Sequence, residues 1–300
     1  MKLVFFLYRQ KGHELDFDPI RFEKSSWILP KREKKAGNLE KSIELVVVST
    51  AKDFDILPHS VKHALNALSK YKYGGVRIIV PKRDVMQCEK LFQNSSRQIS
   101  IIDENTFISK NQFEILSNIF GDRDTWVLQQ LLKVQAVISS KADAVLILDS
   151  DTILLRKRPW FDQEAKQILS PSTEFNPAYY LFLNKMISTP VIPNYTYVSH
   201  HMIMQPNVFK QILKSLDLIR VENLINYCCI NADKTVQSPI CIEYELYGQF
   251  LSLKKDQIAY HALWSNVTIS KTYSRIILNS KVLRILLSRL YNSISFHSWS

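Results

Sequence analysis

The stretch of sequence that decides the fold is Ala144-Val-Leu-Ile-Leu-Asp-Ser-Asp-Thr152. Its first five residues are apolar without any polar alternation, which is typical of a central strand that helices cover on both faces. Asp149 and Asp151 follow this run at once, with only Ser150 between them. The sequence therefore predicts a buried strand that delivers two acidic side chains to the rim of a sheet.

On either side of this strand, strand-like and helix-like segments alternate along the chain. β-Branched runs predict strands at 43–50, 76–80 and 99–102. Helical spacing of apolar residues predicts helices at 59–70, 83–93 and 125–138, the last with Asp124 as its N-cap. Such alternation is typical of an α/β domain in which helices flank a mostly parallel sheet. We expect this single domain to cover residues 43–300, after a basic N-terminal appendage at 1–42.

The second half of the chain is less regular. Strands are expected at 178–183 and 198–204, and helices at 206–216, 240–253 and 274–293. The last of these helices is amphipathic and basic. It fits either a helix docked on the core, which we favour, or a helix that lies on a membrane surface.

The charge balance favours an anionic partner. The net charge is +11, from 39 basic and 28 acidic side chains, and basic clusters occur at 31–35 and 156–158. A phosphorylated substrate, lipid headgroups or nucleic acid would all suit such a charge. No known nucleic-acid-binding motif is present, so we do not expect nucleic acid as a partner.

Several classes of site are excluded by composition. The six glycines form neither GxGxxG nor GxxxxGK[ST], so a cation must neutralise any bound phosphate. The four cysteines form no CxxC and indicate neither a zinc site nor a disulfide framework. The apolar start at 1–8 is short, and no apolar run approaches the roughly 20 residues that span a bilayer. We expect a cytoplasmic protein, with contact at the inner face of the membrane left open.

The two acidic residues point to a divalent cation. Two unit charges about 4 Å apart repel by roughly 4 kcal/mol at an effective dielectric constant near 20. A divalent ion turns this repulsion into attraction, and oxygen ligands suit Mg²⁺ or Mn²⁺, which complete their coordination with substrate phosphates. The alternative is that Asp149 or Asp151 only caps a turn.

The residues around this pair carry a resemblance. The segment 145–152, with Arg158-Pro-Trp160 after it, resembles the Asp-x-Asp segment of GT-A-fold glycosyltransferases. The pattern Trp126-x-x-Gln-Gln-x-x-Lys133 is similar to the helix before that segment in several bacterial polysaccharide transferases. Ser199-His-His-Met-Ile-Met204 and Glu243-Tyr-Glu-Leu-Tyr-Gly248 resemble an uncharacterised bacterial family of this kind. The resemblance covers residues 43–300 and implies a GT-A-like fold.

The resemblance also implies roles for particular residues. Asp151 would bind the metal, and Asp149 would bind the metal or the ribose of the donor. A histidine near the carboxyl terminus often completes such a site, and His297 is preferred here over His261. The remaining candidates for contact with the nucleotide-sugar donor are Ser49, Thr50 and Asp53 after the first strand and Lys133 on the preceding helix.

Glu243 and Glu245 are the candidates for a catalytic base, since inverting transfer requires a carboxylate to take the proton of the acceptor hydroxyl. Side chains two apart on a helix point about 200° from each other, so only one of them faces the site. His200, His201 and Tyr247 are candidates for acceptor contacts. Adjacent residues on a strand point to opposite faces, so one histidine of the pair faces the site. Each of these three residues could equally be part of the core.

The implied activity is the metal-dependent transfer of a sugar from a nucleotide-diphosphate donor to a polysaccharide, glycan or lipid-linked acceptor. A phosphotransferase or nucleotidyltransferase that uses paired carboxylates is one alternative, and a basic nucleic-acid-binding protein is another. The identity of the sugar, and whether the anomeric centre inverts, are left open by the sequence.

Overall fold

The computed structural model describes residues 40–172, 174–187, 196–236, 240–254 and 256–297. The expected appendage at 1–42 and the basic cluster at 31–35 therefore lie almost entirely outside the described residues. The first described strand, β1, begins at Ser42.

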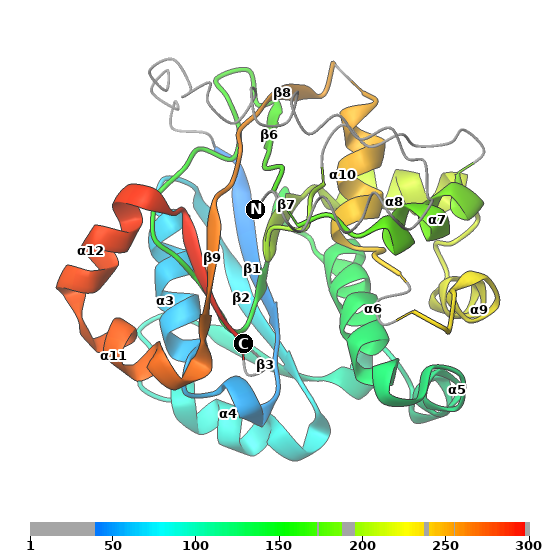
Figure 1. Ribbon diagram of the computed structural model, residues 1–300, viewed down its shortest axis with the longest axis horizontal. Coiled ribbons are helices and arrows are strands. Elements are labelled where there is room, and N and C mark those ends of the chain that lie inside the picture. The colour runs from blue at the N-terminus through cyan, green and yellow to red at the C-terminus, as the bar shows by residue number, and fades with distance from the viewer. Residues whose placement is uncertain (1–39, 173, 188–195, 237–239, 255, 298–300) are drawn as a thin grey trace, which may run out of the picture.

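The core of the fold is a five-stranded sheet with the order β3-β2-β1-β4-β7 (Figure 1). Its strands are β1 (Ser42–Val48), β2 (Lys72–Val80), β3 (Ile99–Asp103), β4 (Ala144–Asp149) and β7 (His201–Met204). The first four are parallel, and only β7 runs antiparallel, beside β4. The predicted α/β fold with a mostly parallel sheet is thus confirmed.

Helices cover both faces of this sheet (Figure 1). One face carries α3 (Leu57–Ala67) and α4 (Val85–Phe92). The other carries α6 (Asp124–Ser139), against which α5 (Lys110–Phe120), α8 (Pro206–Ser215) and α9 (Val221–Asn231) pack.

The side chains of β4 alternate between two hydrophobic cores. Leu146 and Leu148 join the core on the α3 side, whereas Val145 and Ile147 join the core on the α6 side. All four are fully buried. This double burial explains the unbroken apolar run that the sequence shows before Asp149.

Two small sheets accompany the main one. β5 (Thr152–Leu154), β10 (Ser293–His297) and β9 (Asn266–Ser270) form the first, and β6 (Gln167–Leu169) and β8 (Ile258–His261) form the second. The backbone N–H of Phe296 donates to the carbonyl oxygen of Asp151 at 2.9 Å. β10 is therefore joined to the acidic turn by a backbone hydrogen bond.

The remaining helices are α7 (Pro177–Met186), α10 (Tyr244–Ser252), α11 (Ser274–Asn279) and α12 (Lys281–Leu290). Short 3₁₀ turns lie at Ala51–Asp53, Lys82–Asp84, Glu104–Thr106, Gly121–Arg123 and Lys271–Tyr273. No helix in these described ranges is both long enough and apolar enough to span a membrane.

Some sequence predictions were wrong. The expected strand at 178–183 is part of α7, which Pro177 begins and the side chain of Asn176 caps. The expected helix at 274–293 is divided into α11 and α12, since Ser280 caps a new helix, and residues 293–297 form β10. Asp124 is not the N-cap of α6, because Arg123 takes that position after a 3₁₀ turn.

Candidate functional site

The acidic turn lies at a topological switch point of the sheet. From β1 the chain continues outward through β2 and β3, and then returns to place β4 on the opposite side of β1. Val48 at the end of β1 is the neighbour of Asp149 at the end of β4. Ligands of open α/β sheets bind at such a point, beyond the carboxyl ends of the strands.

Three side chains converge on the carboxylate of Asp149. Lys133 Nζ on α6 lies 2.6 Å from its Oδ1. The hydroxyl of Tyr244 on α10 donates to the same oxygen at 2.8 Å, and His200 Nδ1 lies 3.1 Å from Oδ2. A carboxylate offers about four acceptor positions, so these partners leave room for only one more on Oδ2.

The contacts of Asp149 hold it ionised. Burial alone would favour the neutral acid, yet Lys133 and His200 keep the pKa of Asp149 far below its usual range. Burial would likewise lower the pKa of His200, but its bonds to Asp149 and Glu174 raise the pKa to about 10. At neutral pH the site therefore contains two buried cations, Lys133 and His200, around one carboxylate.

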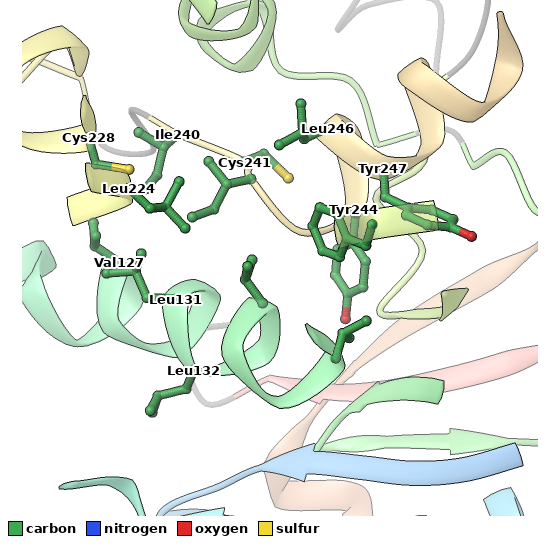
Figure 2. Packing of buried hydrophobic residues seen from close by; sticks show 14 of the residues in the cluster. Val127, Leu131, Leu132, Leu224, Cys228, Ile240, Cys241, Tyr244, Leu246 and Tyr247 are labelled. Carbon is green, nitrogen blue, oxygen red and sulfur yellow. The ribbon is translucent and has the colours of Figure 1, made fainter. Parts of the chain in front are cut away.

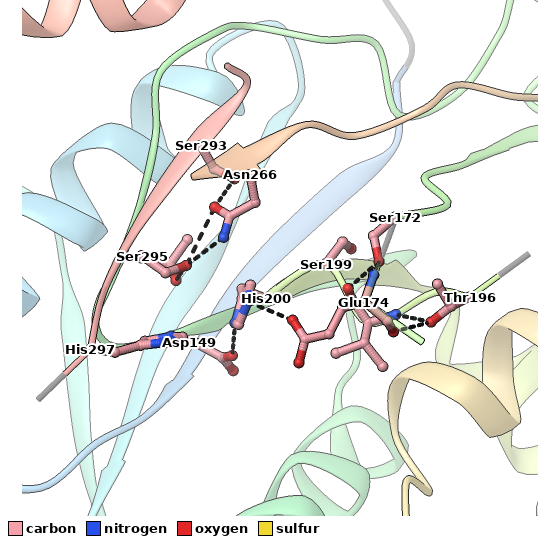
Figure 3. A network of polar contacts seen from close by, with 12 residues as sticks. Asp149, Ser172, Glu174, Thr196, Ser199, His200, Asn266, Ser293, Ser295 and His297 are labelled. Carbon is pink, nitrogen blue, oxygen red and sulfur yellow. Dashed lines mark hydrogen bonds and ion pairs between the residues drawn. The ribbon is translucent and has the colours of Figure 1, made fainter. Parts of the chain in front are cut away.

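His200 bridges two acids. Its Nε2 lies 3.1 Å from Oε2 of Glu174, on the opposite side of the ring from Asp149, and the ring of His297 lies 5.4 Å away between centroids (Figure 3). The backbone of His200 has a φ of 59°, a strained conformation for a residue other than glycine. The backbone N–H of Asp149, which donates to the carbonyl of His200 at 3.0 Å, helps to hold this conformation.

Glu243 completes the interior side of the site. Its Oε1 lies 3.3 Å from Lys133 Nζ, whereas its buried Oε2 has no hydrogen-bond partner in the described part of the chain. Burial raises the pKa of Glu243, and Lys133 opposes this rise.

α6 also sets the position of the segment that carries Glu243 and Tyr244. The side-chain amide of Gln130 donates to the carbonyl of Ile240 at 3.2 Å and accepts from the N–H of Ile242 at 2.9 Å. Figure 2 shows the apolar packing around this connection, where Leu131 of α6 lies close to Leu224 of α9.

Asp151 lies on the outer side of the turn, and its Oδ1 accepts a hydrogen bond from the hydroxyl of Thr152 at 3.2 Å. Its Oδ2 is 3.9 Å from His297 Nε2, and about a fifth of its side chain is exposed. Burial, together with repulsion from Asp149 and Asp53, raises the pKa of Asp151 to about 6. A carboxylate under this repulsion is favourably placed for a cation.

The fit of a divalent metal follows from these contacts. The described residues contain no group of three or more His, Cys, Asp or Glu side chains arranged to hold an ion. Asp151 and His297 nevertheless offer an oxygen and a nitrogen on the same side of the turn. Mg²⁺ is often held by one or two carboxylates together with substrate phosphates, so Asp151 is the principal ligand here and His297 an additional one. The residues therefore fit a metal that a bound diphosphate completes, with Asp149 mainly occupied by protein groups.

The expected nucleotide side is connected to the middle of the turn. The hydroxyl of Ser150 donates to Asp53 Oδ2 at 2.8 Å, and Ser60 on α3 donates to the carbonyl of Ser150 at 2.9 Å. Lys271 Nζ lies 3.3 Å from Asp53 Oδ1. Ser49 and Thr50 follow β1 directly, and the backbone N–H of Ser49 donates to the carbonyl of Ile79 on β2 at 2.9 Å.

Other candidates from the sequence lie elsewhere. Glu245 is buried, and its carboxylate accepts from Thr196, the N–H of Tyr197 and Gln249. The ring of His201 packs 3.9 Å from Trp264 between centroids, so it is His200 that faces the acidic turn. His261 lies in β8 with its Nε2 3.0 Å from the Tyr197 hydroxyl, and the Tyr247 hydroxyl donates to Gln167.

Two residues of the site were not singled out in the sequence. Glu174 lies in a loop, and Lys271 lies in a 3₁₀ turn before α11. Their residue types are common at protein surfaces. Only the tertiary packing brings them together.

Residues 44–284 match the model of a family of unknown function, DUF6492. The chain belongs to the DUF6492 family. A comparison with curated proteins found no match for this DUF6492 chain.

Solved structures similar to this DUF6492 protein include two glycosyltransferases and a synthase. Mouse xyloside xylosyltransferase 1 is 12% identical with a TM-score of 0.43, covering 86% of this chain and 98% of that one. The mannosyltransferase Ktr4p of S. cerevisiae is 8% identical with a TM-score of 0.46, covering 73% of each chain. The 4-diphosphocytidyl-2C-methyl-D-erythritol synthase of Anaerococcus prevotii is 10% identical with a TM-score of 0.38, covering 82% of this chain and 96% of that one.

Proposed function

We propose that this protein is a metal-dependent glycosyltransferase that takes a sugar from a nucleotide-diphosphate donor. The observation that carries the proposal is the placement of Asp149 and Asp151 at the switch point between β1 and β4. The pair lies at the point where such folds bind ligands. Burial and the neighbouring acids raise the pKa of Asp151, so a cation bound beside it would stabilise its ionised form.

In this proposal the donor diphosphate lies over the outer side of the turn. Asp151 and His297 are the residues that would hold Mn²⁺ or Mg²⁺. The ion, when bound, would neutralise the negative charge of the leaving nucleoside diphosphate. Ser49, Thr50 and Asp53 line the end of β1 and are assigned to the base and ribose of the nucleotide.

The inner side of the site is assigned to the reacting sugar. Lys133 and His200 hold Asp149 ionised and in place, so that it can accept a hydrogen bond from a sugar or ribose hydroxyl on its remaining position. Glu243 is the preferred base, because its Oε2 has no partner among the described residues and can accept the proton of an attacking hydroxyl. We do not assign this role to Glu245, whose carboxylate holds Thr196 and Tyr197 in place.

The acceptor is proposed to be a glycan, a polysaccharide or a lipid-linked sugar. The attacking hydroxyl must reach Glu243 beside Lys133, so we assign His200 and Glu174 to other hydroxyls of the acceptor. Glu174 is about half exposed and is therefore accessible to a substrate group.

The experiment is a screen of UDP-, GDP- and CMP-linked sugars for hydrolysis in the presence of Mn²⁺, without and with glycan acceptors. The expected product of the UDP- and GDP-linked donors is a free nucleoside diphosphate, and its release should be lost in Asp151→Asn while the circular dichroism spectrum is unchanged. Asp122→Asn, on an exposed turn, is the control. Turnover in Asp151→Asn equal to that of the wild type would contradict the proposal. Release of pyrophosphate from a nucleoside triphosphate and a sugar phosphate would indicate a nucleotidyltransferase instead.

A further inference from the structure

Exposed apolar side chains gather on one part of the molecule. Half of the fourteen large apolar side chains that are exposed in the described ranges belong to the short segment that contains α11 and α12. They are Tyr273, Ile276, Val282, Leu283, Ile285, Leu286 and Leu290. The two helices lie at one edge of the molecule, outside α3 (Figure 1).

α12 turns its apolar side away from the protein. Val282, Leu286 and Leu290 are 66%, 50% and 70% exposed, and their spacing of four residues places them in one stripe along the helix. On the inner side, the guanidinium of Arg284 donates to the carbonyls of Ile277 and Leu278. A helix docked only on the protein core would show the reverse arrangement.

The apolar stripe is surrounded by positive charge. Arg275, Lys281 and Arg289 are exposed on the two helices. The basic cluster at 156–158 lies beside them, because Arg156 Nε donates to the carbonyl of Ser288 and Arg158 lies 3.4 Å from Asn292. Residues 257–300 contain no aspartate or glutamate. The edge formed by α11 and α12 is therefore apolar at its centre and cationic at its margin.

We infer that the surface of α11 and α12 binds an anionic lipid bilayer. Amphipathic helices with leucines on one side and lysine or arginine beside them lie in the membrane interface, where apolar insertion and attraction to anionic headgroups add together. The surface is less suited to a second copy of the chain, because two such faces would bring their lysines and arginines against each other. The surface is also less suited to nucleic acid, because its centre carries exposed leucines and not the lysines and arginines that contact phosphates. The inference does not depend on the proposed transfer reaction.

The experiment is co-sedimentation of the full chain with two kinds of vesicle. One kind contains phosphatidylcholine alone, and the other contains phosphatidylcholine and phosphatidylglycerol in equal amounts. The wild type should bind the mixed vesicles and bind the neutral ones at least about tenfold more weakly. Val282→Glu with Leu286→Glu should raise the half-saturating lipid concentration about tenfold or more, as should Lys281→Ala with Arg289→Ala. Ile230→Glu, at a position 79% exposed on α9, is the matched control and should bind like the wild type.

Thermal melting would establish that each variant is folded, and the charge variant tests the surface without any change to its apolar residues. Equal binding of the wild type and the double glutamate variant would overturn the inference. It would also be overturned if the wild type did not bind the mixed vesicles but formed a dimer, and the double glutamate variant was a monomer.

Discussion

Lys133 Nζ lies 2.6 Å from Oδ1 of Asp149 and 3.3 Å from Oε1 of Glu243, so one buried lysine compensates two buried carboxylates. Burial acts to lower the pKa of Lys133, but the two carboxylates raise it above its usual range. The two carboxylates therefore favour the charged form of the lysine. It acts as an internal cation on the inner side of the acidic turn, while the outer side at Asp151 has no comparable cation within 3.5 Å in the described ranges.

Replacement of Lys133 by methionine should destabilise the protein strongly. It leaves Asp149 and Glu243 buried without their shared cation, and the loss of one partner from a buried pair costs about 3–5 kcal/mol. The free energy of unfolding in urea would measure this loss. Lys210→Met, at an exposed position on α8, should change it by less than about 0.5 kcal/mol. A Lys133→Met variant as stable as the wild type would show that the pair contributes nothing.

The two glutamates near α10 should respond differently to substitution. Glu243→Gln should lower kcat about a hundredfold or more while leaving donor binding in place, because it removes a base. Glu245→Gln should instead lower the free energy of unfolding by about 1–3 kcal/mol. An amide nitrogen replaces one of the two carboxylate oxygens, so at least one of the buried donors on Thr196, Tyr197 and Gln249 loses its acceptor. Steady-state kinetics and urea unfolding on both variants separate the two roles. The reverse pattern would reassign the base to Glu245.

Gly248 allows α10 to approach Tyr197 closely. A Cβ at this position would lie 2.4 Å from ring atoms of Tyr197 and 2.8 Å from its Cβ. Gly248→Ala should therefore lower the free energy of unfolding by about 1–3 kcal/mol, although alanine is the better helix former. Ser252→Ala in the same helix should have little effect. Greater stability of Gly248→Ala would mean that α10 has room to move.

His201 should make stability depend on pH. Burial lowers the pKa of His201 to about 4 in the folded protein, against about 6.5 when unfolded. The unfolded chain then binds more protons between these values, so the stabilising effect of the neutral histidine is complete above pH 6.5. It is lost progressively as the pH falls toward 4.

Between pH 7 and pH 5 this residue alone should account for a loss of about 2 kcal/mol. His201→Phe keeps a ring of similar size against Trp160 and Trp264 and cannot be protonated. Its free energy of unfolding should therefore fall less over this range than that of the wild type. The same pH dependence in both proteins would rule out His201 as its source.

The parts of the fold that the sequence predicted well are those set by local patterns. The apolar run 144–148 is short and rich in β-branched and branched side chains, which favoured a strand covered on both faces and placed the acids at its carboxyl end. The strand that was wrongly predicted at 178–183 also rested on a local apolar pattern. A short apolar run does not separate strand from helix by itself, and the decisive signals were Asn176 and Pro177 at the start of α7.

The contacts of the site were less accessible from sequence because they join distant segments. Asp149 meets Lys133 from 16 residues away, but Tyr244 from 95 residues away. The identity of Glu174 as the second partner of His200 depends on a loop whose path no local pattern describes. The candidate residues could be proposed from their types, whereas their pairing required the packed helices α6 and α10.

The most direct test of the account is a titration of Mn²⁺ into the protein in the presence of UDP or GDP, followed by calorimetry or by the electron paramagnetic resonance of the free ion. We predict one Mn²⁺ site whose affinity rises with the nucleotide, and which is weakened at least about tenfold in Asp151→Asn but not in the exposed control Asp122→Asn. If Mn²⁺ binds Asp151→Asn as tightly as the wild type, or binds neither protein with nucleotide present, the acidic turn is not a metal site and the proposed transferase mechanism is wrong.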